Sequence, residues 1–570
     1  MSALDWWVLG ATLAFFVGYG LWKSRGRSDV SDYLVAGRRM PWFMVALSVM
    51  ATQASAITFL STPGQGFADG LRFVQFYFGL PLAMIVLCVT AIPIYQRLKV
   101  FTAYEYLESR FDGKTRTLAA ALFLIQRGLA VGLTIYAPAL VLSVILGLDI
   151  RWTVGLLGGL AVIYTVAGGS RAVSHTQALQ FTIILLTMGV AAFVIASSLP
   201  RGVTLGEAAG VAGTLGRLNA LELKFDPNDR YNLWSGLIGG FFLQLSYFGT
   251  DQSQVGRYLT GRSVAESRLG LLTNALLKVP MQLAILSVGV LMFVFYLFVT
   301  PPLFFHPVES AQMRASAAGA EWSALEAQHE AVATARRASV ERLLAARRAG
   351  DEAGLARSRA ELGREQKDLA SARGEAVALI KREHPGANTS DTNYVFLTFV
   401  LAHLPTGLIG LVFAAIFAAS MNSTSAELNA LTSTTVVDVV HRVAPGRFAA
   451  EGPAAVTLSR FVTAGWAVFA VLFASFAARL GSLIEAVNIL GSLFYGTILG
   501  IFLAAFYVKR VGGTAVFAGA IVAEAAVLAC FAFTKIGFLW YNLIGCAVVL
   551  LVALAVTAAR PRGRAAAMPA

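Results

Sequence analysis

The sequence predicts an all-α membrane protein that crosses the bilayer many times. Hydrophobic residues make up 57% of the 570-residue chain and charged residues only 14%, and the mean hydropathy is +0.68. About thirteen apolar stretches have the roughly 20 residues that a helix needs to span a bilayer. A composition this apolar excludes an ordinary soluble domain.

The predicted spans lie, in chain order, at residues 4–22, 41–62, 72–94, 117–146, 152–167, 176–198, 232–256, 271–300, 405–437, 455–477, 482–508, 514–533 and 539–559. The stretch at 152–167 is the shortest of them. The first stretch lacks the basic segment and the small-residue cleavage site of a signal peptide, so we predict a retained span.

Basic residues predict the orientation, because Lys and Arg are enriched in cytoplasmic segments. With the N-terminus outside, inward-facing segments hold 21 Lys and Arg, against seven in the outward-facing segments other than the large loop after residue 305. An odd number of spans then puts the C-terminus in the cytoplasm, for a multi-pass protein of the cell (inner) membrane. The net charge of +13 follows from this distribution, and no nucleic-acid-binding pattern accompanies it.

Residues 306–392 differ from the rest of the chain, since they hold 13 basic and 13 acidic residues and no apolar span. Leu355, Leu362 and Leu369 fall seven residues apart, after a turn-forming stretch at 347–354. This pattern predicts an antiparallel helical hairpin outside the membrane. It divides the chain into 1–305 with eight spans, the hairpin at 306–392, and 393–570 with five spans. The hairpin is either a solvated structural insertion or an arm that binds an unknown protein.

The stretch at 407–432 is an apolar helix that carries polar side chains at mid-membrane depth. Asn422 and Ser423 lie at its centre, and Glu427, Asn429 and Thr432 follow. A buried polar group needs a partner, because an unsatisfied one costs several kcal/mol. Hydroxyl and carbonyl oxygens suit a weakly held monovalent cation. Close helix packing through small residues is the alternative.

Two other spans contain polar residues where a helix break is expected. In the second span Thr52, Gln53 and Ser55 lie at mid-membrane, and in the seventh the stretch 244–252 repeats the theme. Interrupted helices five spans apart are typical of an inverted repeat of five plus five helices, whose freed carbonyls line a binding cavity.

No catalytic motif accompanies these features. A nucleophile elbow, a phosphate-binding glycine-rich loop and paired histidine ligands are all missing from the sequence, so an enzyme is not predicted. Cys88, Cys530 and Cys546 lie in apolar spans and are expected to pack as thiols.

Several local motifs resemble the sodium/solute symporter family, which includes sodium-coupled sugar, proline, sialate, iodide, monocarboxylate and multivitamin transporters. The matches are the stretches 168–180 and 251–258 and the serine-rich helix around Ser423. The stretches 135–140 and 104–111 look most like the iodide, multivitamin and monocarboxylate branch. The resemblance implies a leucine-transporter-type fold with two broken helices.

The resemblance also implies a sodium site built from backbone carbonyls of the first broken helix and from oxygens of the serine-rich helix. The matching positions are Ala51, Ala54, Ala419, Asn422 and Ser423. Asn422 replaces the family's usual hydroxyl residue and offers an amide oxygen instead. The acid of a second sodium site, present in some members, is replaced by Gln177, so one transported sodium ion per cycle is expected.

The solute positions implied by the resemblance are Gln53, Gln244 and Lys278, with Tyr247 as an aromatic inner gate and Tyr77 and Asn488 as further pocket residues. Arg127 and Lys278 are cations inside spans, where charge is expensive and usually faces a cavity or a partner. Two cations beside a pocket favour an anionic solute. Alternatively, Arg127 pairs with a backbone carbonyl or a hidden acid, and Lys278 extends its side chain from the cytoplasmic end of its span.

The sequence therefore predicts a sodium-coupled secondary active symporter that imports a small polar organic solute, with a monocarboxylate or other organic anion preferred. A sodium-coupled sugar, polyol or amino-acid symporter is the alternative. A proton-coupled permease of the same fold would carry a basic or titratable group in place of Asn422 and Ser423. A membrane sensor would add a cytoplasmic output domain, and few residues follow the last span.

Overall fold

The computed structural model describes residues 1–24, 39–444, 453–477 and 481–559. Within these ranges the chain is helical between its loops, with one isolated backbone bridge between Met40 and Gly261. Basic residues such as Arg25, Arg38 and Arg447, which contribute to the predicted orientation, lie outside the described residues.

The helices up to the second break are α1 (Ala3–Ser24), α3 (Trp42–Gln53), α4 (Ala56–Asp69), η2 (Gly70–Tyr77), α5 (Leu80–Val89), α6 (Ala91–Leu98), α7 (Glu105–Arg110), α8 (Gly113–Leu146), α9 (Ile150–Ser197), α10 (Leu205–Thr214), η3 (Ser235–Gly239) and α11 (Gly240–Gly249). Then come α12 (Gln252–Tyr258), α13 (Val264–Phe298), α14 (Pro307–Ala315), α15 (Gly319–Ala349), α16 (Glu352–Glu383) and α17 (Thr392–His403). The last are α18 (Leu408–Thr434), η4 (Thr435–Val440), α19 (His441–Val443), α20 (Pro453–Ala474), α21 (Leu483–Tyr507), α22 (Gly513–Phe533) and α23 (Leu539–Ala559).

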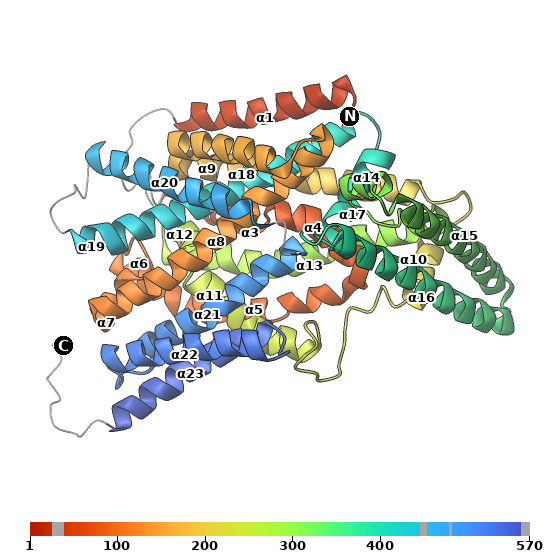
Figure 1. The fold of residues 1–570 in the computed structure, drawn as a ribbon. Coiled ribbons are helices and arrows are strands. Elements are labelled where there is room, and N and C mark those ends of the chain that lie inside the picture. The colour runs from red at the N-terminus through yellow and green to blue at the C-terminus, as the bar shows by residue number, and fades with distance from the viewer. Residues whose placement is uncertain (25–38, 445–452, 478–480, 560–570) are drawn as a thin grey trace.

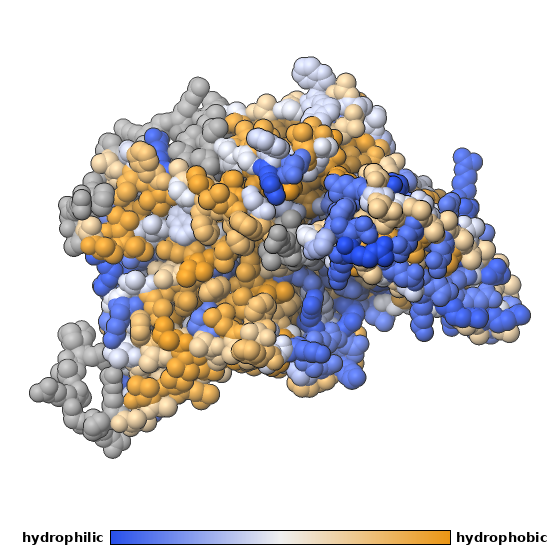
Figure 2. Space-filling view, in the orientation of Figure 1, coloured by the Kyte–Doolittle hydropathy of each residue, from blue (hydrophilic) through white to orange (hydrophobic). Residues whose placement is uncertain are grey.

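The predicted all-α polytopic architecture is confirmed. Among the described residues, nine helical stretches are long and apolar enough to cross a membrane, and Ala3–Tyr19 and Trp42–Gln53 are shorter apolar helices. Most of these helices run in a common direction (Figure 1). Apolar side chains cover much of their outer surface, whereas hydrophilic side chains gather over α15 and α16 (Figure 2).

The predicted spans at 152–167 and 176–198 are not separate helices, because α9 runs through both as one helix of 48 residues. At 1.5 Å per residue it is about 72 Å long, well beyond the roughly 30 Å of a hydrocarbon core. The sequence predicts two separate stretches because residues 168–175 interrupt the apolar run and include a glycine pair. Glycine costs only about 1 kcal/mol inside a helix, so it weakens a helix without ending it.

Both predicted helix breaks are present. The first separates α3 from α4 at Ala54, whose backbone (φ −89°, ψ 72°) leaves the helical region. The second separates α11 from α12 at Thr250 and Asp251, where the Asp251 carboxylate caps α12 by accepting from the Ser253 backbone N–H at 2.9 Å. Breaks of this kind free carbonyl groups that the helix would otherwise use.

The broken helices pack at the centre of the bundle. α3 and α4 lie against α13, while α18 contacts α8, α9 and α1, and α21 contacts α8, α11 and α23. Glycines permit the closest approaches: a Cβ atom at Gly289 of α13 would overlap the Pro63 carbonyl of α4. At the core of the bundle, the two helices of the first break therefore pack against α18 and α13.

The charged insertion forms a hairpin of α15 and α16, which contact each other along their length. The turn between them uses Gly350 in the left-handed region (φ 69°) and Asp351, which caps α16. Leu343 packs with Leu355 and Leu362, in a cluster that also includes residues of α13. The hairpin therefore projects from one end of the bundle (Figure 1), and the part next to its turn packs against α13 and α10. α1 begins at that same end, and α23 ends at the opposite one.

Candidate functional site

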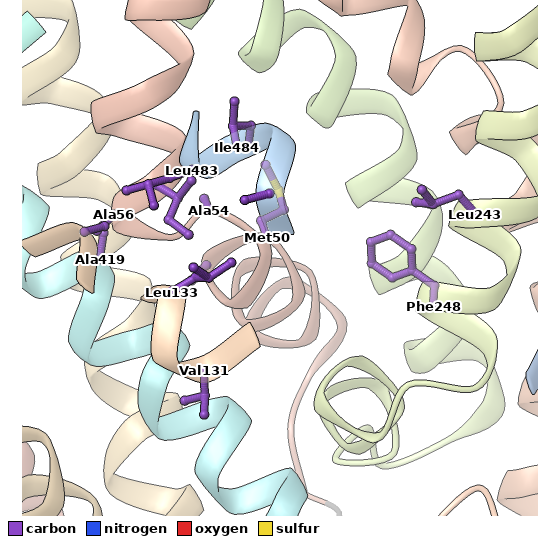
Figure 3. Close-up of a cluster of buried hydrophobic side chains, with 14 of the residues drawn as sticks. Met50, Ala54, Ala56, Val131, Leu133, Leu243, Phe248, Ala419, Leu483 and Ile484 are labelled. Atoms are coloured by element: carbon purple, nitrogen blue, oxygen red, sulfur yellow. The ribbon is translucent and has the colours of Figure 1, made fainter. Parts of the chain in front are cut away.

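A direct hydrogen bond joins the first helix break to α18. The Ser423 hydroxyl donates to the carbonyl oxygen of Thr52 at 3.2 Å. The predicted sodium-site residues Ala51, Ala54, Ala419, Asn422 and Ser423 are all buried, with at most 1% of each exposed. Figure 3 shows Ala54 and Ala419 among buried apolar side chains that include Leu133 and Leu483. The predicted sodium site is buried and lies where α3 and α18 meet.

The oxygen atoms at this meeting point fit a monovalent cation. The Asn422 Oδ1 atom is buried and has no hydrogen-bond partner among the described residues. Leaving such an acceptor unsatisfied costs about 1–3 kcal/mol. The last carbonyls of α3 also lack helical N–H partners because the helix ends there. A hydroxyl, an amide oxygen and backbone carbonyls are hard ligands of low charge, as a weakly held sodium ion requires.

Gln177 occupies the position where some relatives of the resembled family carry an acid. Its side chain is buried in α9 and contacts α3, accepting from the Ser48 hydroxyl at 2.7 Å and donating to the Thr52 hydroxyl at 3.4 Å. The amide is thus engaged by neutral partners. It adds no negative charge beside the break.

A small cavity of about 90 Å³ opens next to the break. It is lined by Thr52, Gln53, Ser55, Ile57, Thr58, Phe76, Tyr77, Gln126, Arg127, Thr134, Leu243, Gln244, Tyr247, Glu427, Ile484, Val487, Asn488 and Tyr495. All the predicted solute positions line this cavity except Lys278. The cavity is well below the roughly 300–1,000 Å³ of sites that hold drug-sized ligands, so it suits a small solute.

The two glutamines predicted to contact the solute take different positions. Gln53 is the last residue of α3 and lies at the break, as predicted. Gln244 lies inside α11, five residues before that helix ends, and not in the second break. The expectation that both sit in breaks is therefore wrong for Gln244, because the chain stays helical until Thr250. The amide oxygens of both side chains are buried without a hydrogen-bond partner in the described part of the chain.

Arg127 lines the cavity but is not an unpaired cation. Its guanidinium forms ion pairs with Asp251 and with Glu427 Oε1, the latter at 3.0 Å, and donates to the Tyr495 hydroxyl at 2.8 Å. Two carboxylates therefore surround one cation, and Glu427 Oε2 has no partner among the described residues. The alternative in which Arg127 pairs with a hidden acid is the arrangement present. Arg127 thus gives no support to an anionic solute.

The sequence did not identify Asp251, Glu427 and Tyr495 as a group around Arg127. Glu427 and Asp251 were visible as acids within or beside spans, and such residues need partners. That signal would have linked them to Arg127, although α8, the second break and α18 lie far apart in the chain. Tyr495 gave no signal, since a tyrosine in an apolar span is ordinary.

Tyr247 lies at the wall of the cavity toward the second break. Its hydroxyl accepts from the Gln254 side chain at 2.7 Å, and its ring centroid lies 5.9 Å from that of Tyr495. The Arg127 guanidinium carbon lies 5.6 Å from the same ring. These contacts fix the Tyr247 ring at the cavity wall.

Lys278 lies well inside α13. α13 begins at Val264, so Lys278 lies fourteen residues, or about 21 Å, from its start, and the residue is only 1% exposed. It does not extend to the surface. Its Nζ atom lies 5.3 Å from the centre of the Tyr77 ring, and the ion pairs of the described residues do not include it. Lys278 therefore lies next to a side chain that lines the cavity, without lining the cavity itself.

Comparison with known proteins identifies the family. The model of the sodium:solute symporter family matches residues 33–323 and 370–523. The human sodium/iodide cotransporter is 32% identical over 305 residues, covering 52% of this chain and 46% of that protein. The human sodium-coupled monocarboxylate transporter 1 is 32% identical over 279 residues, covering 47% of this chain and 44% of that protein. The chain spans about half the length of the curated relatives it matches.

A solved structure of a Na⁺-coupled sialic acid symporter has the same fold, with a TM-score of 0.74 and 21% identity over 98% of both chains. This likeness confirms the predicted fold class, and the matched relatives include the predicted iodide and monocarboxylate branch. Since the family model covers most of its length, the chain belongs to the sodium:solute symporter family.

Proposed function

We propose that the protein is a sodium-coupled secondary active symporter that imports a small polar organic solute by alternating access. The observation that carries the proposal is the adjacency of two residues at the first break. The Thr52 carbonyl accepts from Ser423 at the candidate sodium site, and the next side chain, Gln53, lines the cavity. One peptide unit thus connects the ion site to the solute site.

Coupling follows from this connection. Sodium held between α3 and α18 would fix the end of α3 and with it the Gln53 side chain. Suppose that the solute prefers the same arrangement of α3. By linkage, bound sodium then raises the affinity for the solute, and bound solute raises the affinity for sodium by the same factor. An inward-directed membrane potential adds about 2.3 kcal/mol per charge per 100 mV to the driving force.

One sodium ion per cycle is proposed. Gln177 is neutral and engaged with Ser48 and Thr52, which supports a single site at Ala51, Ala54, Ala419, Asn422 and Ser423. Glu427 is the carboxylate among the residues that line the cavity, and it is paired with Arg127, which also pairs with Asp251. No catalytic role is proposed, since the matched relatives are named as transporters.

A monocarboxylate or another organic anion is the preferred solute. The names of the relatives support this choice, and so does Lys278, a buried cation with no acidic partner in the described part of the chain. A sugar, polyol or amino acid is the second candidate. It is supported by the charge balance at the cavity, where Arg127 is neutralised and Glu427 keeps one free oxygen.

The proposed location is the cell (inner) membrane, with the N-terminus and the hairpin outside and the C-terminus in the cytoplasm. The position of the start of α1 beside the hairpin, opposite the end of α23, supports this orientation (Figure 1). We also propose the division of the chain into 1–305, the hairpin segment 306–392 and 393–570, which is supported by the projection of α15 and α16 from the bundle (Figure 1).

An uptake assay in proteoliposomes tests the proposal. Purified protein is given a panel of labelled monocarboxylates, sugars and amino acids, with an inward gradient of sodium, potassium or protons. Accumulation of one class that requires the sodium gradient supports the proposal and names the solute. Equal uptake with potassium or proton gradients would overturn it.

A further inference from the structure

A second cavity lies between the hairpin and the bundle, at the end of the bundle where α15 and α16 project (Figure 1). Its volume is about 280 Å³, and it is lined by Phe67, Ala68, Arg217, Phe293, Pro301, His329, Arg336, Gln366, Leu369, Ala370, Arg373, Asp391, Thr392 and Val395. The family model does not cover residues 324–369. His329, Arg336 and Gln366 are therefore contributed by a segment outside the matched part of the chain.

Positive charge exceeds negative charge on the wall of this cavity. Three arginines line it against one carboxylate, Asp391. Arg373 holds both oxygens of that carboxylate, at 2.8 and 2.9 Å. Arg217 and Arg336 form no ion pair with any described residue, so two guanidinium groups face the cavity without an anion.

These two arginines are held by neutral groups. Arg336 donates to the Tyr296 carbonyl at 2.7 Å and to the Gln366 side chain at 3.4 Å. Arg217 donates to the Ala68 carbonyl, and its guanidinium carbon lies 4.4 Å from the centre of the Phe293 ring. The Nε atom of each arginine is buried and has no acceptor in the described part of the chain.

Two further acids, Glu365 and Asp69, lie close enough to Arg336 and Arg217 to oppose the lowering of each guanidinium pKa by burial, but neither forms an ion pair with these arginines. Glu365 accepts from the Ser339 hydroxyl at 2.7 Å, and Asp69 accepts from the Gln65 side chain. Neither lines the cavity. Burial lowers the pKa of Arg336 to about 10, and burial together with Arg373 and Arg336 lowers the pKa of His329 to about 4. An anion in the cavity would remove part of this cost.

The planar guanidinium group matches the paired oxygens of carboxylates and phosphates, with which it forms strong charge-assisted hydrogen bonds. Arg336 is 4% exposed, so water screens such a pair less than at the surface. We propose that this cavity binds a small oxyanion, a carboxylate or a phosphate, between Arg217 and Arg336. Bound there, the anion ties the hairpin to the ends of α4 and α13.

Oxyanions reach this place from two sources, the surrounding solution and the headgroups of anionic lipids. The test uses purified full-length protein in detergent at constant sodium concentration and ionic strength. One arm titrates inorganic phosphate or acetate against chloride and follows the thermal unfolding temperature. The other arm titrates a short-chain anionic phospholipid against a zwitterionic one.

The proposal predicts a saturable rise in unfolding temperature with the oxyanion in at least one arm. Arg336→Gln and Arg217→Gln each weaken that apparent affinity at least tenfold. Arg337→Gln is the matched control, because Arg337 is the next residue of α15 and forms an exposed pair with Glu341. Gln53→Leu is the control for binding in the central cavity, and it should keep the full rise.

The two arms of the experiment identify the source of the bound oxyanion, and in both cases the two arginines bind the same kind of group. A response to the anionic lipid alone indicates headgroup binding, and a response to phosphate or acetate indicates a site open to solution. If Arg336→Gln does not fold, Arg217→Gln carries the test. No oxyanion-specific rise in either arm, or an unchanged affinity in both arginine variants, would overturn the proposal.

Discussion

Replacing Arg127 with glutamine removes the one cation that neutralises two buried carboxylates. Asp251 is fully buried and the Glu427 side chain is 8% exposed. Breaking a buried ion pair by removing one partner costs about 3–5 kcal/mol, because the other charge stays buried without compensation. At 1.36 kcal/mol per factor of ten, the ratio of folded to unfolded protein should fall roughly 10²- to 10⁴-fold.

The structure predicts a clear asymmetry between the partners of this cluster. Glu427→Gln keeps an amide oxygen near Arg127 Nη1 and leaves the Arg127–Asp251 pair intact. It should therefore cost less than Arg127→Gln, within the roughly 1.5–3 kcal/mol of one hydrogen bond to a charged group. A triple variant that combines Arg127→Gln, Glu427→Gln and Asp251→Asn contains no charge in this cluster. It should recover much of the stability that Arg127→Gln alone loses.

Thermal and denaturant unfolding of the detergent-purified variants measures these differences, without sodium or solute. The expected order of stability is wild type, then Glu427→Gln, then the triple variant, then Arg127→Gln. An Arg127→Gln protein as stable as the wild type would refute the cluster as described. So would a triple variant less stable than Arg127→Gln.

The remaining predictions concern the central cavity and its packing. Gln53→Leu should weaken solute binding more than Gln244→Leu, since Gln53 also adjoins the sodium site; radioligand binding at saturating sodium compares the two, and normal transport by Gln53→Leu would contradict the assigned break. Lys278→Gln should lower the affinity for a carboxylate solute, affect a neutral solute less and leave sodium binding unchanged. Competition assays with charged and neutral solutes measure these affinities. Unchanged affinities for all solutes would show that Lys278 has no role in solute binding. Gly289→Ala should destabilise the protein by about 1–3 kcal/mol through overpacking against α4, whereas Gly159→Ala, with open space around it, should be near neutral in the same unfolding assay.

Much of the fold could be predicted because the bilayer imposes strong rules on the sequence. A polar residue in an apolar span must have a partner, so Thr52 and Gln53 marked the first break and Asn422 and Ser423 marked the helix that meets it. The charge-rich segment at 306–392 stood out because no such stretch can lie in lipid. These signals are local and need no knowledge of how the helices pack.

The parts that could not be predicted depend on distant contacts or on the ends of helices. Nothing in the sequence near Arg127 shows that Glu427, 300 residues away, lies beside it. The predicted start of α13 is too late because hydropathy locates only the apolar part of that helix. Ser263 caps that helix by accepting from the Glu266 backbone N–H at 3.2 Å, so the helix starts before the apolar stretch.

The sodium dependence of uptake by Ser423→Ala, compared with Asn488→Ala, tests the central claim most directly. Ser423 joins α18 to the Thr52 carbonyl, whereas Asn488 lines the same cavity and donates to the Ile484 carbonyl of its own helix. Initial rates in proteoliposomes are measured over a range of sodium concentrations. Wild type should show a Hill coefficient near one, and Ser423→Ala should need far more sodium for half-maximal uptake than Asn488→Ala. Equal sodium requirements in the two variants would contradict the account and leave Ser423 as a packing residue.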